Sequence, residues 1–311
     1  MKHPSFDLTT NFAGHKLKNP VFTASGTCGY VDELNDFLDV NCLGGFITKS
    51  ITLKPRLGNP TPRIVETDSG MLNAIGLANI GLDRFIEEKL PLIEKLSTPV
   101  FVNVAGQTAE EYVAVTEAIC SQKALAGIEL NISCPNVKEG GITFGKDPVQ
   151  IEKITALVKK ACANKTLIVK LTPTVTEISD SARAAINGGA DSLSLVNTFT
   201  AMVIDIEKRK PVLANRTGGL SGPAIKPMAI YLVNKVYNDV AKKANIPILG
   251  LGGIATASDA IEFMIAGATC VAVGTATFAQ PNCCQKIVEG IENYCLRQKL
   301  SSLAELTGSL I

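Results

Sequence analysis

Eight short runs of apolar, mostly β-branched residues recur along the chain, and segments with helical periodicity separate them. Near-continuous runs of Val, Ile and Leu are typical of parallel strands that are buried on both faces. This alternation predicts one α/β domain over residues 1–311, a (β/α)8 or TIM barrel. The predicted strands cover residues 20–25, 45–49, 100–104, 127–132, 167–171, 192–197, 247–252 and 270–274.

Several of the intervening segments carry helix signals. Residues 151–163, 178–185 and 226–243 place apolar side chains at helical spacing. Thr256 begins a capping-box pattern in which Asp replaces the usual Glu or Gln at the third helical position, and Gly267 suits the end of that helix. These helices would cover the outside of the barrel.

Net charge and apolar content exclude several classes of protein. Lys and Arg number 30 and Asp and Glu 29, so the net charge is +1, which argues against a nucleic-acid binder. The N-terminal segment lacks the apolar core of a signal peptide, and the uncharged stretch 263–285 is interrupted by Gly and Pro. We therefore expect a cytoplasmic protein without a membrane segment.

Cysteine and histidine usage narrows the chemistry further. The nine cysteines form no CxxC pair and no disulfide framework, which favours reduced thiols. The two histidines, His3 and His15, both precede the first predicted barrel strand. This argues against Ser-His-Asp and Cys-His catalysis and against a zinc site, so no metal site is predicted.

Polar residues or glycines stand at the end of each predicted strand. In a barrel these ends meet at the C-terminal mouth, where active sites lie. The glycines after the last two strands suit a phosphate group, because backbone N–H groups can approach an anion closely there. In chain order the strand ends are Ser25, Lys49, Asn103, Asn131, Lys170, Asn197, Gly252 with Gly253, and Gly274 with Thr275.

Three long connections rich in Gly, Pro and polar residues follow the second, fourth and sixth predicted strands. They cover residues 52–81, 134–148 and 199–226. Long irregular connections in a folded domain are usually functional, so we interpret them as long βα loops that form lids over the mouth.

One cysteine stands apart from the others because it directly follows a strand end. Cys134 lies three residues after Asn131 and enters one of the long loops. A thiol at this position can act as a nucleophile, act as a general base, or simply fill space. Residue type alone does not choose among these roles.

Four motifs give the chain a specific resemblance. They are NISCPN at residues 131–136, NAIGL at 73–77, Asn-Thr at 197–198, and GLSGPAIKP at 219–227. Together they resemble the class 1 dihydroorotate dehydrogenases, and the resemblance extends from about residue 18 to about residue 278. Residues 52–63 are more similar to the NAD-linked class 1B than to the fumarate-linked class 1A.

The resemblance implies an FMN enzyme that oxidises dihydroorotate to orotate in pyrimidine biosynthesis. Cys134 matches the family's catalytic base, which removes a proton from C5 while hydride passes from C6 to flavin N5. The substrate-binding residues it implies are Lys49, Asn73, Ala74, Ile75, Gly76, Leu77, Asn131, Asn136, Asn197 and Thr198. The FMN-binding residues it implies are Ser25, Lys49, Ser50, Asn103, Asn131, Lys170, Val196, Gly222, Gly252, Gly253, Gly274 and Thr275.

The resemblance also implies a partner. Class 1B chains form a homodimer core that binds a second subunit carrying FAD and a [2Fe–2S] cluster, which gives a heterotetramer using NAD. Four alternatives remain open from the sequence: a fumarate-dependent class 1A homodimer, another FMN barrel acting on a pyrimidine, a Schiff-base aldolase using Lys170, and a barrel without turnover.

Overall fold

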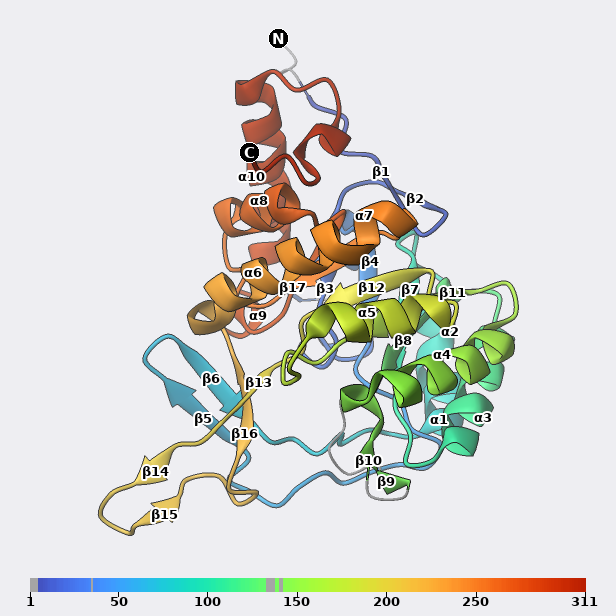
Figure 1. The fold of residues 1–311 in the computed structure, drawn as a ribbon, viewed down its shortest axis with the longest axis vertical. Helices are drawn as coiled ribbons and strands as arrows, with labels where there is room; N and C mark the ends of the chain where they lie inside the picture. Colours follow the sequence, from blue (N-terminus) through green and yellow to red (C-terminus); the bar gives the residue numbers. More distant parts are fainter. Residues whose placement is uncertain (1–4, 35, 133–137, 140–141) are drawn as a thin grey trace.

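The computed structural model describes residues 5–34, 36–132, 138–139 and 142–311. Eight parallel strands close into a barrel, in which each strand pairs with the next and the last pairs with the first (Figure 1). This confirms the predicted (β/α)8 barrel and each of its eight strands. The strands are β3 (Val21–Thr23), β4 (Gly45–Ile47), β7 (Val100–Val104), β8 (Gly127–Asn131), β11 (Thr166–Lys170), β12 (Ser192–Leu195), β17 (Ile248–Leu251) and β18 (Cys270–Val273).

Helices surround the barrel and bury its outer face. The predicted helix 151–163 is confirmed as α4, which begins at Pro148 because the Asp147 side chain accepts a hydrogen bond from Val149 N. The capping box at Thr256 is confirmed as well. The helices are α1 (Leu82–Arg84), η2 (Phe85–Lys89), α2 (Leu90–Ile93), α3 (Ala109–Cys120), α4 (Pro148–Cys162), α5 (Ile178–Asn187), α6 (Lys226–Val236), η5 (Tyr237–Ala241), α7 (Lys242–Ala244), α8 (Ala257–Ala266), α9 (Ala276–Ala279) and α10 (Cys283–Gln298).

One predicted helix, residues 226–243, is divided into three consecutive helical segments, and four short 3-10 helices lie elsewhere in the described chain. The segment 226–243 contains α6, the π-helical η5 and the start of α7 rather than one uniform helix. The 3-10 helices are η1 (Val40–Cys42), η3 (Phe144–Lys146), η4 (Pro223–Ile225) and η6 (Leu303–Leu306).

An N-terminal hairpin of β1 (Thr10–Phe12) and β2 (His15–Leu17) covers the end of the barrel where the strands begin. Phe12 and Leu17 are buried against barrel residues such as Phe22. His15 Nε2 lies 2.9 Å from Thr166 Oγ1, at the first residue of β11. His15 is therefore at the opposite end of the barrel from the mouth.

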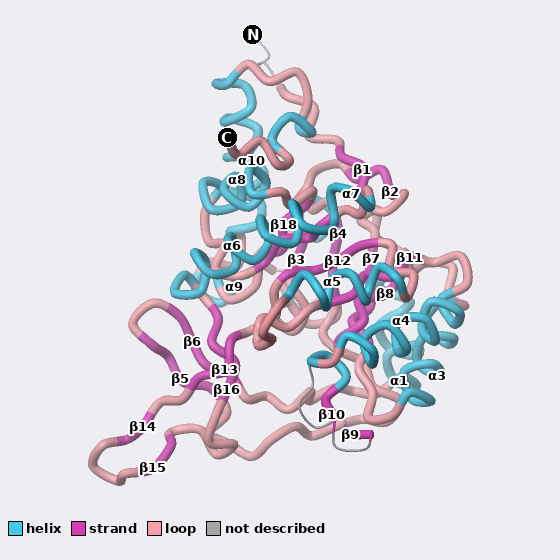
Figure 2. Tube along the Cα trace, in the orientation of Figure 1, coloured by secondary structure: helices cyan, strands magenta, loops and turns pink. Residues whose placement is uncertain are grey.

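Two of the three predicted lid segments form a common sheet instead of irregular loops. The strands β5 (Ile64–Thr67) and β6 (Gly70–Asn73) pair with β13 (Phe199–Ala201) and β16 (Gly218–Ser221) in the order β13-β16-β6-β5. A hairpin of β14 (Ile204–Asp205) and β15 (Lys210–Pro211) projects beyond this sheet (Figure 2). The third segment contains the short pair β9 (Lys138–Glu139) and β10 (Ile142–Thr143). The sequence analysis did not predict that the first two segments share a sheet, because the β6–β16 pair that joins them is between distant parts of the chain, whereas β5 and β6 form a local hairpin.

Among the described helices, none is both long enough and apolar enough to cross a bilayer. Within the same described ranges, no group of three or more His, Cys, Asp or Glu side chains is placed to hold a metal ion.

Candidate active site at the barrel mouth

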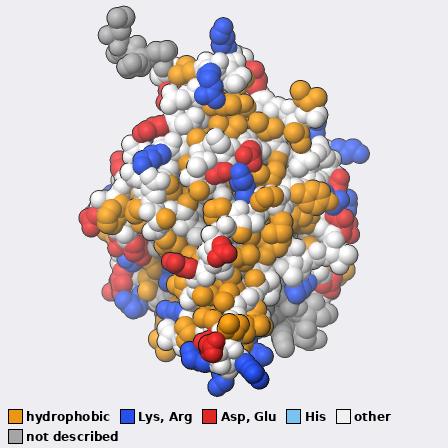
Figure 3. Space-filling view, turned by 90° about the vertical axis from the view of Figure 1, so that its left-hand side faces the viewer, with side chains coloured by type: hydrophobic (Ala, Val, Ile, Leu, Met, Phe, Trp, Pro, Cys, Tyr) orange, Lys and Arg blue, Asp and Glu red, His pale blue; other side chains and the backbone are white. Residues whose placement is uncertain are grey.

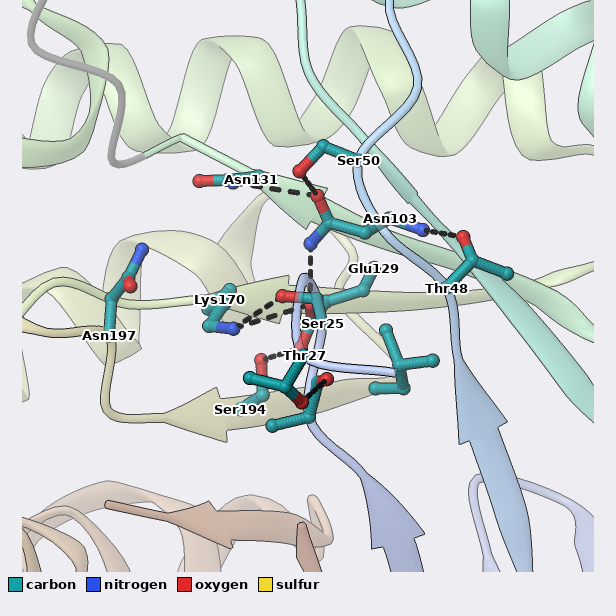
Figure 4. A network of polar contacts seen from close by, with 12 residues as sticks. Ser25, Thr27, Thr48, Ser50, Asn103, Glu129, Asn131, Lys170, Ser194 and Asn197 are labelled. Atoms are coloured by element: carbon teal, nitrogen blue, oxygen red, sulfur yellow. Dashed lines mark hydrogen bonds and ion pairs between the residues drawn. The ribbon is translucent and has the colours of Figure 1, made fainter. Parts of the chain in front are cut away.

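Polar side chains from five consecutive barrel units meet at the C-terminal ends of the strands (Figure 4). Lys170, the last residue of β11, donates from Nζ to Ser25 Oγ just after β3, at 2.8 Å across the barrel. Ser50, after β4, donates to Asn103 Oδ1 in β7 at 2.5 Å. Asn131 Nδ2, at the end of β8, approaches the same Oδ1 at 3.5 Å. The Glu129 side chain joins these two groups into one network, because it contacts both Lys170 and Asn103.

The network has an acidic member that the sequence analysis did not identify. Glu129 in β8 is fully buried, and its Oε2 lies 3.6 Å from Lys170 Nζ. The same oxygen accepts from Asn103 Nδ2 at 2.5 Å, and Oε1 accepts from Ser194 Oγ at 2.8 Å. The signal was present in the sequence, because a carboxylate two residues before Asn131 faces the same side of a strand.

Ser25 and Ser50 have opposite hydrogen-bonding roles toward a ligand, one as donor and one as acceptor. A lysine ammonium can only donate, so Ser25 accepts from Lys170 and keeps its own hydroxyl hydrogen for another acceptor. Ser50 donates its hydroxyl hydrogen to Asn103, so its oxygen lone pairs can accept from another donor. A ligand at the mouth would therefore meet a donor at Ser25 and an acceptor at Ser50.

The glycines after β17 meet the segment after β16. Gly252 and Gly253 have φ values of +130° and +83°, which favour glycine. A Cβ atom on Gly253 would lie 2.8 Å from the carbonyl oxygen of Gly222. Beside them, Thr275 Oγ1 donates to Ser221 Oγ at 2.8 Å.

Gly274 is the remaining glycine of this group and comes directly after β18. A Cβ atom there would lie 3.3 Å from the Ala24 side chain, so the backbone is close to the segment after β3. Five predicted FMN-binding residues thus come from three segments at one edge of the mouth. They are Gly222, Gly252, Gly253, Gly274 and Thr275.

The four-stranded sheet brings two predicted substrate residues together across one glycine. Asn73, at the end of β6, pairs in register with Gly219 of β16, and its Nδ2 is 3.5 Å from Gly219 O. A Cβ atom on Gly219 would lie 2.0 Å from Thr198 Oγ1. Gly219 therefore leaves room for the Thr198 side chain beside the strand that pairs with Asn73.

The loop after β6 contains the remaining predicted contacts of that segment. Ala74 N donates to Arg63 O, and Ala74 O accepts from Asn59 Nδ2. Ile75 O accepts from Asn59 N, and Gly76 and Leu77 adopt positive φ. These hydrogen bonds fix the loop 73–77 beside the sheet.

Val196 and Asn197 follow β12 directly and lie at the barrel mouth. Val196 is buried, and its N–H donates to Leu251 O at 2.9 Å. Asn197 N–H donates to Leu171 O at 3.0 Å, while Asn197 Oδ1 accepts from Thr198 N at 2.8 Å. Because its Oδ1 holds the Thr198 backbone, Asn197 presents its side-chain NH2 group as the donor.

Lys49 follows β4 and is half-buried. Burial, followed by the positive charge of Arg63, lowers the pKa of Lys49, and Glu33 acts weakly in the opposite direction. The positive charges of Lys49 and the nearby Arg63 would favour an anionic ligand.

Cys134 and Asn136 lie outside the described residues, so the structure does not test their predicted roles. The described strand that leads to them is firmly placed, because the buried Tyr112 hydroxyl donates to Asn131 O at 2.7 Å. Tyr112 lies on α3 and is a second residue that the sequence analysis did not connect to the site.

Comparison with known proteins agrees with the geometry. The family model described as dihydroorotate dehydrogenase matches residues 7–295. The chain is 53% identical over 305 residues to a protein of Geotalea uraniireducens named dihydroorotate dehydrogenase B (NAD(+)), catalytic subunit, with 98% of each chain covered. A protein of Geobacter metallireducens with the same name is 49% identical over 310 residues, which cover 100% of this chain and 99% of the relative. The chain belongs to the dihydroorotate dehydrogenase family.

Proposed function

We propose that this chain oxidises dihydroorotate to orotate in pyrimidine biosynthesis and that its bound cofactor is FMN. The observation that carries the proposal is the network at the barrel mouth in which Glu129 joins Lys170 and Ser25 to Asn103, Ser50 and Asn131. Family membership and the names of the relatives support the same activity.

The residues present fit an FMN phosphate. Close backbone approach between Gly253 and Gly222 leaves no room for side chains, as a cradle of N–H groups requires. The position after the seventh and eighth barrel strands is also the usual phosphate site of such barrels. We assign the phosphate to Gly222, Gly252, Gly253, Gly274 and Thr275.

The polar network would hold the isoalloxazine ring. Its pyrimidine half alternates C=O and N–H groups, and the opposite hydrogen-bond characters of Ser25 and Ser50 suit such an edge. Lys170 supplies positive charge there, with Asn103, Asn131 and backbone at Val196 as further contacts.

Dihydroorotate is a ring of amide groups with one carboxylate. Asparagine offers both a donor and an acceptor, so Asn73, Asn131, Asn136 and Asn197 can read such a ring. Thr198 and the loop 73–77 would complete the site, and the positive charge of Lys49 would attract the dihydroorotate carboxylate. An analogue without these polar groups would leave the amides unpaired and would bind weakly.

Cys134 is assigned as the general base that takes the C5 proton. Its support is its position three residues after Asn131, at the mouth end of β8. FMN held at the mouth would supply the acceptor for the hydride from C6. The thiolate is the reactive form, so turnover should rise as the pH passes through the range where the thiol ionises.

We further propose that electrons pass to NAD+ through a partner subunit carrying FAD and [2Fe–2S], in a heterotetramer built on a homodimer. The relatives' names include both NAD(+) and catalytic subunit, which supports a partner. Hydrophobic side chains gather on the face on the side of β5, β6, α6 and α9 (Figure 3). Exposed Ile64, Tyr231 and Phe278 on these elements suit subunit contacts. All eight described cysteines are free thiols, which suits the cytoplasm.

The visible spectrum of the purified chain tests the proposal. We expect a yellow protein that bleaches when dihydroorotate, but not dihydrouracil, is added without oxygen. A colourless protein that borohydride inactivates together with a carbonyl substrate would instead indicate a Schiff-base aldolase. In steady state, the isolated chain should use NAD+ poorly, and rapid turnover with fumarate would place it in class 1A.

A further inference from the structure

Glu129 is a buried charge to which the proposed reaction assigns no task. Among the described residues, Glu129 and Lys170 are the two charged side chains in the buried interior, with exposed fractions of 0% and 4%. Burying an ionised carboxylate is costly unless it is paired and hydrogen-bonded. A costly buried charge next to a candidate binding site indicates that the charge has a function in that site.

Glu129 contacts both groups of the network, Lys170 with Ser25 and Asn103 with Ser50 and Asn131. Oε2 faces Lys170 Nζ at 3.6 Å and accepts from Asn103 Nδ2 at 2.5 Å, while Ser194 donates to Oε1. Asn103 lies opposite Glu129 in the β7–β8 register, and Lys170 lies opposite Ser194 in the β11–β12 register. Four adjacent strands therefore hold the carboxylate in one position (Figure 4).

We propose that Glu129 is a positioning residue for FMN chemistry, which holds the Lys170 side chain in place through an ion pair and fixes the orientation of the Asn103 amide. This inference rests on the proposed function. A buried ammonium group is costly without an anionic partner, and the described structure supplies that partner in Glu129, whose Oε2 lies 3.6 Å from Lys170 Nζ.

The amide orientation follows from the same carboxylate. Because Glu129 accepts from Asn103 Nδ2, Oδ1 must point toward Ser50 and Asn131. That orientation makes Ser50 an acceptor toward the ligand. Glu129 thus acts on FMN through Lys170 and Asn103 and need not touch it.

The consequence concerns the affinity for reduced FMN. Lys170 would place its positive charge where reduced FMN is anionic, so displacement of Lys170 Nζ would weaken binding of the reduced form selectively. Glu129→Gln keeps an oxygen for Asn103 and an NH2 group for Ser194, whose hydroxyl can rotate to accept. The variant therefore removes the charge and keeps the shape.

The test is the midpoint potential of bound FMN, measured in the full chain. For Glu129→Gln we expect the ratio of the dissociation constants of reduced and oxidised FMN to rise roughly tenfold. That ratio corresponds to about 30 mV of lower potential for a two-electron couple. An unchanged or higher potential would overturn the inference, because Lys170 would then keep its position without Glu129.

A double-mutant cycle separates action through Lys170 from direct action on FMN. In a Lys170→Met background, adding Glu129→Gln should leave the potential unchanged, and removing both buried charges together is usually tolerated. A rise in potential of the double variant over Lys170→Met would show that the Glu129 charge acts directly. This comparison also decides the matter if Glu129→Gln alone does not fold.

Asp191→Asn is the matched control. Asp191 pairs with Lys159 at 2.6 Å and accepts from Leu167 N near the start of β11, at the other end of the barrel. Its loss should leave the potential unchanged. If the wild-type chain neither binds FMN nor is reduced by dihydroorotate, the proposed function fails; if it does both and Glu129→Gln has no effect, only this inference fails.

Discussion

Gly253 lies so close to Gly222 that a Cβ atom on Gly253 would stand 2.8 Å from the Gly222 carbonyl oxygen and 2.9 Å from Lys226 Cβ. Gly253 also has a φ of +83°. Gly253→Ala should therefore lower the free energy of unfolding of the FMN-free chain by about 1–2 kcal/mol from backbone strain. Displacement of the neighbouring backbone should cost about 1–3 kcal/mol more, and FMN retention should fall.

Gly14→Ala is the matched control for that prediction. Gly14 has a φ of +86°, yet nothing lies within 4 Å of the position of its Cβ atom. It should show the strain cost alone and retain FMN fully. Denaturant unfolding and the absorbance of bound flavin measure both quantities. Equal effects of the two substitutions would argue against a close-approach cradle at Gly253.

Asn197→Asp tests the donor assigned to this side chain. The carboxylate can still accept from Thr198 N, which now lies 2.8 Å from Oδ1, but the NH2 donor is lost and a negative charge faces an anionic substrate. We expect kcat/KM for dihydroorotate to fall roughly 100-fold or more, with FMN still bound. Asn238→Asp, on the exposed surface of η5, should leave kcat/KM unchanged.

Cys134→Ser should slow the reduction of bound FMN by dihydroorotate by orders of magnitude, because a serine hydroxyl is a far weaker base than a thiolate. FMN content should stay at the wild-type level. Anaerobic stopped-flow absorbance measures the rate. Reduction at a near wild-type rate would remove Cys134 from the mechanism.

Cys120→Ser serves as the control for the loss of a thiol. Cys120 ends α3, seven residues before β8 begins at Gly127, and so belongs to the end of the barrel away from the mouth. Its substitution should leave the reduction rate and its pH dependence unchanged.

The pKa of Lys49 predicts how substrate binding depends on pH. Burial and the nearby Arg63 lower this pKa from the ordinary 10.5, so Lys49 loses its proton at a lower pH than a free lysine does. In the slow Cys134→Ser variant, the Kd for dihydroorotate should rise as the pH increases through that lowered pKa. Lys49→Arg keeps its charge at alkaline pH, so it should abolish this rise. A Kd independent of pH in both variants would contradict the assignment.

Local patterns predicted the barrel and most of its mouth. The strands were recognisable because a strand buried on both faces needs a continuous apolar run, and that requirement is local. The polar residue at each strand end followed from the same pattern, which is how Ser25, Asn103, Asn131 and Lys170 were found. Glu129 could have been found in this way too, from its period-two relation to Asn131.

The lid segments could not be predicted to the same extent. β6 (GMLN) and β16 (GGLS) are short and contain glycine, and the pair that joins the two segments in one sheet is between residues that are far apart in the sequence. Propensity carries little information in such segments, since the pairing partner supplies the hydrogen bonds.

The sequence by itself determined the fold class and the chemical types of the groups at the mouth, because strand burial and side-chain identity are properties of local sequence. Only the tertiary structure decided which groups touch and in which direction each hydrogen bond runs. The opposite characters of Ser25 and Ser50, and the carboxylate of Glu129 between Lys170 and Asn103, depend on distances across the barrel. Those distances are fixed by barrel closure, which joins residues that are far apart along the chain.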